Sequence, residues 1–196
     1  MKRGSIFADD AAMESRLILD EADLLQKVEA LKALKAKLVL TSGSFDLPHI
    51  GHMRYLHAAR MLGDFLIVGI DSDAKVRARK GKYRPIIPEL ERAEMIAHTR
   101  YADIITIKDG GGEKWGLIKL VRPDVLVISE RTGYDEATQA ELLQYCGKIE
   151  NLQSQATTST SAQFRRLQTE TLLPNLERIR ATVNEIEREL VGEEGA

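Results

Sequence analysis

The chain lacks a disulfide framework, a signal-like N-terminus and any membrane-length apolar run. Only one of its 196 residues is a cysteine, Cys146, which is typical of proteins from a reducing compartment. The N-terminal residues contain no apolar core of signal-peptide length, and no stretch approaches the roughly 20 apolar residues of a membrane span. These absences predict a soluble, cytoplasmic protein without a membrane partner.

The chain also lacks an excess of charge of either sign. Its 28 lysines and arginines oppose 30 aspartates and glutamates, which gives a formal net charge of -2. Nucleic-acid-binding proteins usually carry a basic surface, so we expect no nucleic-acid partner. A chain of this length suits one domain with appendages, and it is long enough to bury a sizeable core.

What the chain does contain is an alternation of apolar strand-like runs with helical patterns. Strands are predicted at 38–41, 65–71, 103–107, 125–129 and near 149–152, and helices at 52–62, 88–99, 114–121 and 134–146. This alternation predicts an α/β fold with a Rossmann-like, doubly wound parallel sheet. Such sheets bind ligands at the carboxyl ends of their strands, at the point where the strand order reverses.

Helical appendages are predicted at both ends of this sheet. The first is one helix over residues 9–36, with Leu17, Leu24, Val28 and Leu31 on one face. The predicted organisation is an N-terminal helical extension over 1–37, a central domain over 38–170 and a C-terminal amphipathic helix over 171–196.

The C-terminal helix carries apolar residues at alternating spacings of four and three, with Pro174 and Asn175 at its start and Gly192 after its end. This narrow heptad seam favours self-association, although it also suits a helix packed on its own domain. The seam consists of Leu172, Leu176, Ile179, Val183, Ile186 and Leu190.

The segment from Thr41 to His52 carries the strongest chemical pattern in the chain. It joins a predicted strand to a predicted helix, where free N–H groups and the positive end of the helix dipole form a phosphate cradle. His49 and His52 can lie on one side of this turn, and Gly51 between them leaves room for a phosphate chain. Two imidazole donors beside such a cradle suit the stabilisation of a phosphoryl group under attack.

These histidines also have two simpler interpretations. A single histidine at a helix start often only caps the helix or packs against it, and a His-x-x-His pair can bind zinc. Zinc needs further ligands at matching spacings, and the remaining candidates are only Cys146, His57 and His98. We therefore predict no protein-bound metal.

The pattern Thr41-x-Gly43-x-Phe45-Asp46-x-x-His49-x-Gly51-His52 resembles the signature of the cytidylyltransferase-like nucleotidyltransferases. This family includes cytidylyltransferases for glycerol 3-phosphate and ethanolamine phosphate, and the adenylyltransferase domain that makes ADP-heptose. The resemblance covers residues 38–165 and includes the Lys80-Gly81 and Arg84-Pro85 pairs.

The resemblance implies an enzyme that joins a nucleoside monophosphate from ATP or CTP to a phosphorylated small molecule and releases pyrophosphate. Mg²⁺ would accompany the triphosphate, and family members are often homodimers. The implied catalytic residues are His49, His52 and Lys80. The implied nucleotide-binding residues are Gly43, Ser44, Phe45, Gly51, Asp71, Ser159, Thr160 and Ser161, and the implied ligands of the acceptor phosphate are Arg84 and Arg92.

A basic run follows the second predicted strand, with six cations among the eleven residues from Lys75 to Pro85. A charge run is usually a solvated face. We expect this one, as a mobile loop at the strand end, to clamp the phosphates. Arg92 has the alternative of a surface arginine paired with Glu89 or Glu91.

The hydroxyl run at 157–161 precedes a predicted helix start, which makes an anion site or simply a polar loop with a cap. In the family a similar run contacts the phosphates of the nucleotide. Cytidylyltransferases have an arginine before this run, and Ser154 stands about where it would be. The ADP-heptose type lacks that arginine too, which favours ATP as the donor.

The acceptor is not defined by these motifs. The ADP-heptose type usually has Lys-Gly-Gly-Asp-Tyr where this chain has Ser129-Glu130-Arg131 followed by Thr132-Gly133-Tyr134. Arg131 is placed either to pair with an anionic acceptor or to bridge to Glu130 or Asp135.

Other functions fit the sequence less well. A nucleotide-sensing module that has lost turnover remains the alternative, although His49, His52 and Lys80 are all present. A fragment of a class I tRNA synthetase would need a Lys-Met-Ser-Lys-Ser-like loop, which is missing. A dinucleotide-dependent oxidoreductase would need a Gly-x-Gly-x-x-Gly motif after the first strand, and no such motif follows that strand here.

Overall fold

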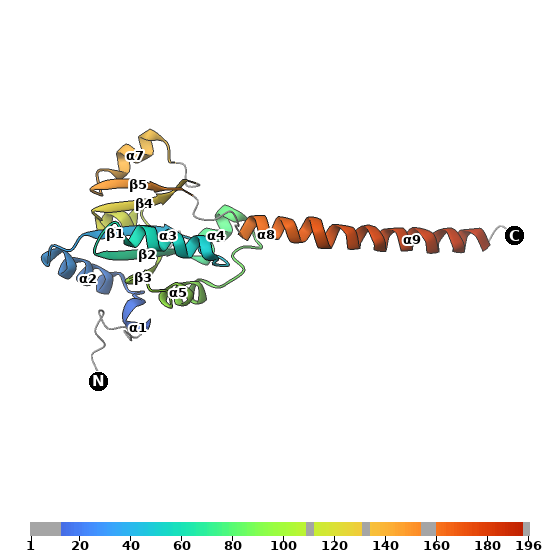
Figure 1. Cartoon of the computed structure of the whole chain (residues 1–196), viewed down its shortest axis with the longest axis horizontal. Coiled ribbons are helices and arrows are strands. Elements are labelled where there is room, and N and C mark those ends of the chain that lie inside the picture. Colours follow the sequence, from blue (N-terminus) through green and yellow to red (C-terminus); the bar gives the residue numbers. More distant parts are fainter. Residues whose placement is uncertain (1–12, 109–111, 131–133, 154–159, 194–196) are drawn as a thin grey trace. The chain divides into compact units, whose positions relative to one another are not determined.

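The computed structural model describes residues 13–108, 112–130, 134–153 and 160–193 (Figure 1). The chain divides into two compact units, Met1–Thr157 and Thr158–Ala196. The predicted boundaries at residues 37 and 170 stay predictions, and the two units are described separately below.

The first unit is built on one five-stranded parallel sheet. Its strands are β1 (Leu38–Gly43), β2 (Phe65–Asp71), β3 (Ile104–Lys108), β4 (Val125–Ser129) and β5 (Lys148–Leu152). The spatial order is β3-β2-β1-β4-β5, with every neighbouring pair parallel. The strand order therefore reverses between β1 and β4, which confirms the predicted Rossmann-like, doubly wound sheet.

Helices cover both faces of this sheet (Figure 1). On one face α3 (Ile50–Arg60) and α5 (Glu89–Ala97) pack against the odd-numbered apolar residues of β1 and the even-numbered ones of β2. On the other face lie α2 (Glu21–Ala33), α6 (Gly116–Val121) and α7 (Glu136–Leu142). The central strands β1, β2 and β4 contain continuous apolar runs because they are buried on both sides.

The N-terminal helix differs from the prediction of one helix over 9–36. Within the described residues it is two helices, α1 (Met13–Arg16) and α2, separated by an extended stretch. There Leu17 forms a parallel bridge with Ile105, and Asp20 caps α2 by accepting a hydrogen bond from the Asp23 amide at 2.9 Å. A capping aspartate and a sheet partner together outweigh the helical periodicity.

The basic run after β2 was predicted as a loop, and this prediction is wrong for its first part. Asp73–Lys80 forms helix α4. Ser72 caps it by accepting a hydrogen bond from the Lys75 amide at 3.2 Å, and Gly81 ends it with φ of 94°, a value that favours glycine. Lys75, Arg79 and Lys80 are therefore held at helical spacing on a fixed element.

The second unit is helical from Thr160 onwards. It comprises α8 (Thr160–Leu167), a π-helical turn η2 (Gln168–Leu172) and α9 (Leu173–Glu193). The start of α9 agrees with the predicted position of Pro174, but helical structure precedes it. Proline cannot donate the next helical hydrogen bond, and the wider turn before it is the kind of adjustment that accommodates this.

No helix among the described residues is long and apolar enough to cross a lipid bilayer.

Candidate active site

The point where the strand order reverses is held together by a hydroxyl pair. The Thr41 hydroxyl on β1 lies 2.7 Å from the Tyr55 hydroxyl on α3, and it also donates to the Val127 carbonyl on β4 at 3.0 Å. Burial raises the pKa of Tyr55 to about 12, so this phenol stays neutral. The helix that carries the two histidines is thereby bonded to both central strands.

His49 and His52 together cap the N-terminus of α3. The Nδ1 atom of His49 accepts a hydrogen bond from the Gly51 amide at 3.1 Å, and Nδ1 of His52 accepts one from the His49 amide at 3.2 Å. Their ring centroids are 4.1 Å apart, and the Phe45 ring lies 5.5 Å from that of His52. The sequence prediction that both imidazoles lie on one side of the turn is confirmed.

This capping geometry decides which ring nitrogen carries the proton. A nitrogen that accepts a hydrogen bond from a backbone amide cannot itself be protonated, so in both neutral imidazoles the proton sits on Nε2. Each histidine is therefore fixed as an Nε2–H donor by the backbone of the helix start. That is the form needed to donate a hydrogen bond to a phosphoryl oxygen.

The loop between β1 and α3 is held in a strained conformation. Phe45 and Leu47 both have positive φ values, 45° and 54°, which non-glycine residues seldom adopt. Asp46 between them is buried and accepts hydrogen bonds from the amides of Ile86 and Ile87 at 3.0 and 3.2 Å. Strain of this kind persists only where the surroundings impose it, and here the 84–87 segment does so.

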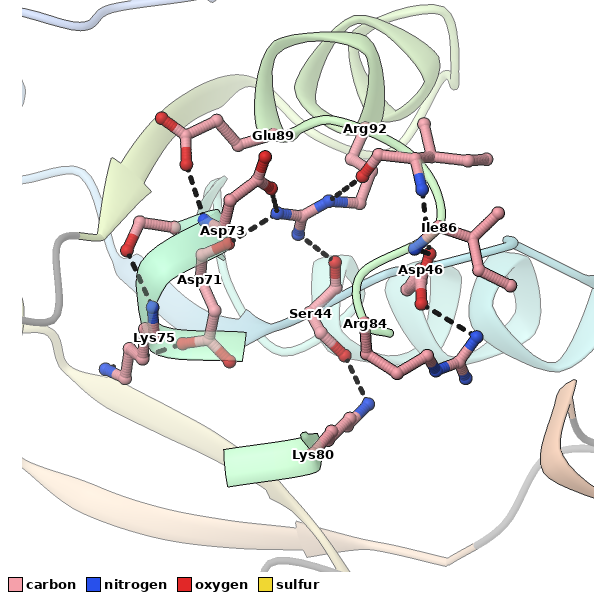
Figure 2. A network of polar contacts seen from close by, with 12 residues as sticks. Ser44, Asp46, Asp71, Asp73, Lys75, Lys80, Arg84, Ile86, Glu89 and Arg92 are labelled. Carbon is pink, nitrogen blue, oxygen red and sulfur yellow. Dashed lines mark hydrogen bonds and ion pairs between the residues drawn. The ribbon is translucent and has the colours of Figure 1, made fainter. Parts of the chain in front are cut away.

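Three cations of the basic run, Lys75, Lys80 and Arg84, contact residues at the ends of β1 and β2 (Figure 2). Lys80 donates to the Ser44 hydroxyl at 2.8 Å, and Arg84 pairs with Asp46 at 3.0 Å. Desolvation lowers the pKa of Lys80, and the positive charges of Arg79 and Arg84 lower it further. Lys80 and Arg84 therefore contact two residues of the β1–α3 loop, and their binding of phosphates stays a prediction.

Asp71, at the carboxyl end of β2, serves as the counter-ion of α4. Its carboxylate is buried and lies 2.9 Å from Arg79 and 3.5 Å from Lys75. A direct contact of Asp71 with the nucleotide stays a prediction. In the structure its carboxylate already forms ion pairs with Lys75 and Arg79 of α4.

Arg92 is fully buried, so its alternative as a surface arginine paired with Glu89 or Glu91 is wrong. Figure 2 shows its guanidinium at the centre of the network. It donates to the carbonyls of Ile87 (2.8 Å), Asp71 (2.9 Å) and Ser44, and to the Asp73 carboxylate (2.7 Å). Every nitrogen of the group has a protein acceptor, so Arg92 positions the site, and its predicted contact with the acceptor phosphate stays a prediction.

Some of the predicted site residues lie outside the described residues, and others belong to the second unit or to another helix. Ser159 and Arg131 lie outside the described residues. Thr160 and Ser161 begin α8 in the second unit. Asp135, one proposed partner of Arg131, caps α7 by accepting a hydrogen bond from the Thr138 amide at 2.8 Å. Gly43 and Gly51 lie where predicted, at the end of β1 and in the first turn of α3.

Sequence reasoning missed one cation, Lys108, the last residue of β3. Its ammonium lies 3.4 Å from the Ser42 hydroxyl on β1. Burial and the neighbouring charge of Lys75 lower the pKa of Lys108 to about 8. The sequence feature that could have identified Lys108 is a lysine at the end of an apolar strand, directly before Asp109 and three glycines.

Among the described residues, no group of three or more His, Cys, Asp or Glu side chains is arranged to hold a metal ion.

Comparison with known proteins agrees with this architecture. Residues 40–171 match the family model described as cytidylyltransferase-like. The chain belongs to this family.

Two curated relatives are both named bifunctional protein HldE. The chain is 38% identical over 132 residues to the protein of a Nitratiruptor species, and 43% identical over 110 residues to that of Campylobacter jejuni subsp. doylei. The matches cover 64% and 55% of this chain but only 28% and 24% of the relatives. The chain therefore spans about a quarter of the length of the curated relatives it matches.

Two solved structures are also similar. A lipopolysaccharide core biosynthesis protein from Thermoplasma volcanium GSS1 superposes with a TM-score of 0.55 at 27% identity, over 61% of this chain and 98% of that one. A pantoate-beta-alanine ligase from Francisella tularensis gives a TM-score of 0.50 at 12% identity, over 74% of this chain and 68% of that one. The second likeness shows the fold alone.

The buried network predicts a large effect of Arg92→Met on stability. Removing the buried guanidinium leaves three carbonyls and one carboxylate without their donor, so we expect the free energy of unfolding to fall by about 3–5 kcal/mol. Urea denaturation measures this. The control Arg77→Met, at an exposed position of α4, should change it by less than about 0.5 kcal/mol. Equal effects of the two substitutions would contradict the proposed role of Arg92.

Proposed function

We propose that this protein is a nucleotidyltransferase that moves the adenylyl group of ATP to a phosphorylated sugar or polyol and releases pyrophosphate. The observation that carries the proposal is the reciprocal capping of α3 by His49 and His52, which leaves both Nε2 atoms as proton donors. They stand at the positive end of a helix that starts at the reversal point of the sheet.

The proposed reaction is an in-line displacement at the α-phosphorus. An oxygen of the acceptor phosphate attacks the α-phosphorus, and a new P–O bond forms. The bond from the α-phosphorus to the bridging oxygen breaks, and its electron pair leaves with pyrophosphate. The Nε2–H groups of His49 and His52 donate to the crowded phosphoryl oxygens, while Lys80 holds the phosphate chain beside Ser44.

We propose that Mg²⁺ enters with the triphosphate rather than being held by the protein. Mg²⁺ usually binds through substrate phosphates and retained waters, which suits a site built from histidine donors and cations. When bound, it supplies charge neutralisation on the phosphate chain.

The adenylyl donor and the sugar-phosphate acceptor rest on the relatives. The similarity to proteins named HldE and to a lipopolysaccharide core biosynthesis protein supports a sugar phosphate. The absence of an arginine near Ser154, where cytidylyltransferases have one, supports ATP. Because its substrates are nucleoside triphosphates, we place the protein in the cytoplasm.

The donor is tested by measuring pyrophosphate release with ATP, CTP, GTP and UTP. Each is paired with heptose and hexose 1-phosphates, glycerol 3-phosphate, phosphoethanolamine and phosphocholine. We expect ATP to exceed CTP by roughly tenfold to a hundredfold, the effect of one or two hydrogen bonds at the base edge. A preference for CTP would overturn the adenylyl assignment. Nucleotide binding without release from any pair would favour the sensing module.

The role of the histidines is tested at His52 with two substitutions. His52→Asn keeps a side-chain acceptor for the amide of His49, whereas His52→Ala removes it, so only the alanine variant should lose about 1 kcal/mol of stability. Both lack the Nε2 donor, and both should lower kcat by about 10²–10⁴-fold. Near-normal turnover in the folded asparagine variant would contradict the mechanism.

We further propose that the protein is a homodimer formed through α9. Leu172 at the end of η2 and Leu176, Ile179, Val183 and Ile186 on α9 recur at heptad spacing, and about half of each side chain is exposed in this unit. A seam of this kind is stabilised by burial against a second copy.

The dimer is tested by Ile179→Asp combined with Val183→Asp. Two buried charges in the seam should reduce the mass measured by light scattering from twice the chain mass to the chain mass. The matched control, Ala181→Asp with Asn184→Asp, adds the same charge away from the seam and should stay dimeric. Dimers of both variants would mean that α9 does not mediate association.

A further inference from the structure

Three cations surround one carboxylate at the carboxyl ends of β2 and β3. Lys75 and Arg79 project from α4 onto Asp71, at 3.5 and 2.9 Å. Lys108 is the direct neighbour of Asp71 in the β2–β3 register. The group therefore holds a surplus of two positive charges, a quantity that matches a phosphate monoester dianion.

This group continues onto β1 across a glycine of β2. Ser42, Gly69 and Lys108 lie side by side on the face that α6 covers. A Cβ added to Gly69 would lie 3.3 Å from the Cβ of Ser42 and 3.7 Å from that of Lys108. The ammonium of Lys108 donates to the Ser42 hydroxyl across Gly69, and the side chain of Lys75 lies beside that of Lys108.

The electrostatics of Lys108 indicate a charge that is not yet neutralised. Burial and the charges of Lys75 and Arg79 lower its pKa to about 8, although the carboxylate of Asp71 opposes them. Tyr134 also faces this group, but burial raises its pKa, so it stays neutral. Where the surroundings disfavour the charged form of a lysine, a bound anion stabilises that charged form.

Resting on the proposed function, we propose that Lys108, Lys75 and Ser42 form the subsite that binds the anionic phosphate group of the acceptor. The donor triphosphate already has Lys80 beside the β1 loop. Lys108 stands two strands away from the reversal point, on the far side of β2. We therefore place the acceptor phosphate beside β3 and the donor triphosphate beside the β1 loop.

The existing partners of the nearby cations favour Lys108 as the ligand of the acceptor phosphate. The guanidinium of Arg92 is occupied by four protein acceptors, and Arg84 is paired with Asp46. Lys108 instead has a long contact of 3.4 Å to a hydroxyl and faces the like charge of Lys75. Its charge is the one that an acceptor phosphate neutralises with least rearrangement.

One test measures the ammonium of Lys108 directly, without turnover. The lysines of the full chain are labelled by reductive ¹³C-methylation, and the Lys108 resonance is assigned from its loss in Lys108→Arg. In chloride we expect it to titrate with a pKa of about 8. Adding orthophosphate as the probe should raise this pKa toward the ordinary value of lysine, because the bound anion stabilises the charged form. An unchanged pKa would overturn the subsite.

A second test separates the acceptor from the donor by kinetics, with the acceptor identified from the panel. Lys108→Met should raise the KM for the acceptor by about tenfold or more and leave the KM for ATP within about twofold. Lys80→Met should do the reverse, and Lys108→Arg should retain most of the acceptor affinity. Lys148→Met, at the start of β5 and paired with Glu150, is the matched control and should change neither constant.

The two tests fail in different ways. If no nucleotide and acceptor pair releases pyrophosphate, the proposed function fails, and the orthophosphate titration still decides whether Lys108 binds a phosphate. If turnover is normal but Lys108→Met leaves the KM for the acceptor unchanged and orthophosphate leaves the pKa of Lys108 unchanged, the subsite is wrong and the transferase assignment stands.

Discussion

The burial of the Arg92 guanidinium is the constraint on which the rest of the site depends. A fully buried charge is tolerated only when every donor is satisfied, and this one is satisfied by the carbonyls of Ser44, Asp71 and Ile87 and by the carboxylate of Asp73. These acceptors belong to the end of β1, the end of β2, the segment before α5 and the start of α4. One side chain therefore sets the mutual positions of the segments that carry His49, Asp71 and Lys80.

A second constraint on the site is that two buried carboxylates fix the positions of three cations. Asp46 and Asp71 are both buried, and each anchors cations at the strand ends: Arg84 at Asp46, and Lys75 with Arg79 at Asp71. The carboxylates hold the basic groups in place without cancelling their summed charge. An anionic ligand then meets donors whose positions are already fixed, so less conformational entropy is lost on binding.

The family relationship and the local chemistry answer different questions. The match over residues 40–171 establishes the family, and in our proposal the helix cap of His49 and His52 prepares both imidazoles for the chemistry. In our proposal the acceptor is decided by residues outside those motifs, such as Lys75 and Lys108. A pocket built around charged side chains selects by the polar groups it must satisfy, which is why these positions bear on specificity.

The sequence by itself determined the parallel sheet and the strand–turn–helix segment that carries His49 and His52. Strands β2 and β4 were predicted with their observed bounds, because apolar runs buried on both faces leave an unambiguous pattern. Tertiary structure decided what periodicity cannot express: the break before Asp20, the helical state of the basic run, the burial of Arg92 and the encounter of Lys108 with Ser42. The break, the burial of Arg92 and the Lys108 contact depend on partners distant in the chain, Ile105 for Leu17, Ser44 for Arg92 and Ser42 for Lys108, and a local sequence pattern does not identify such partners.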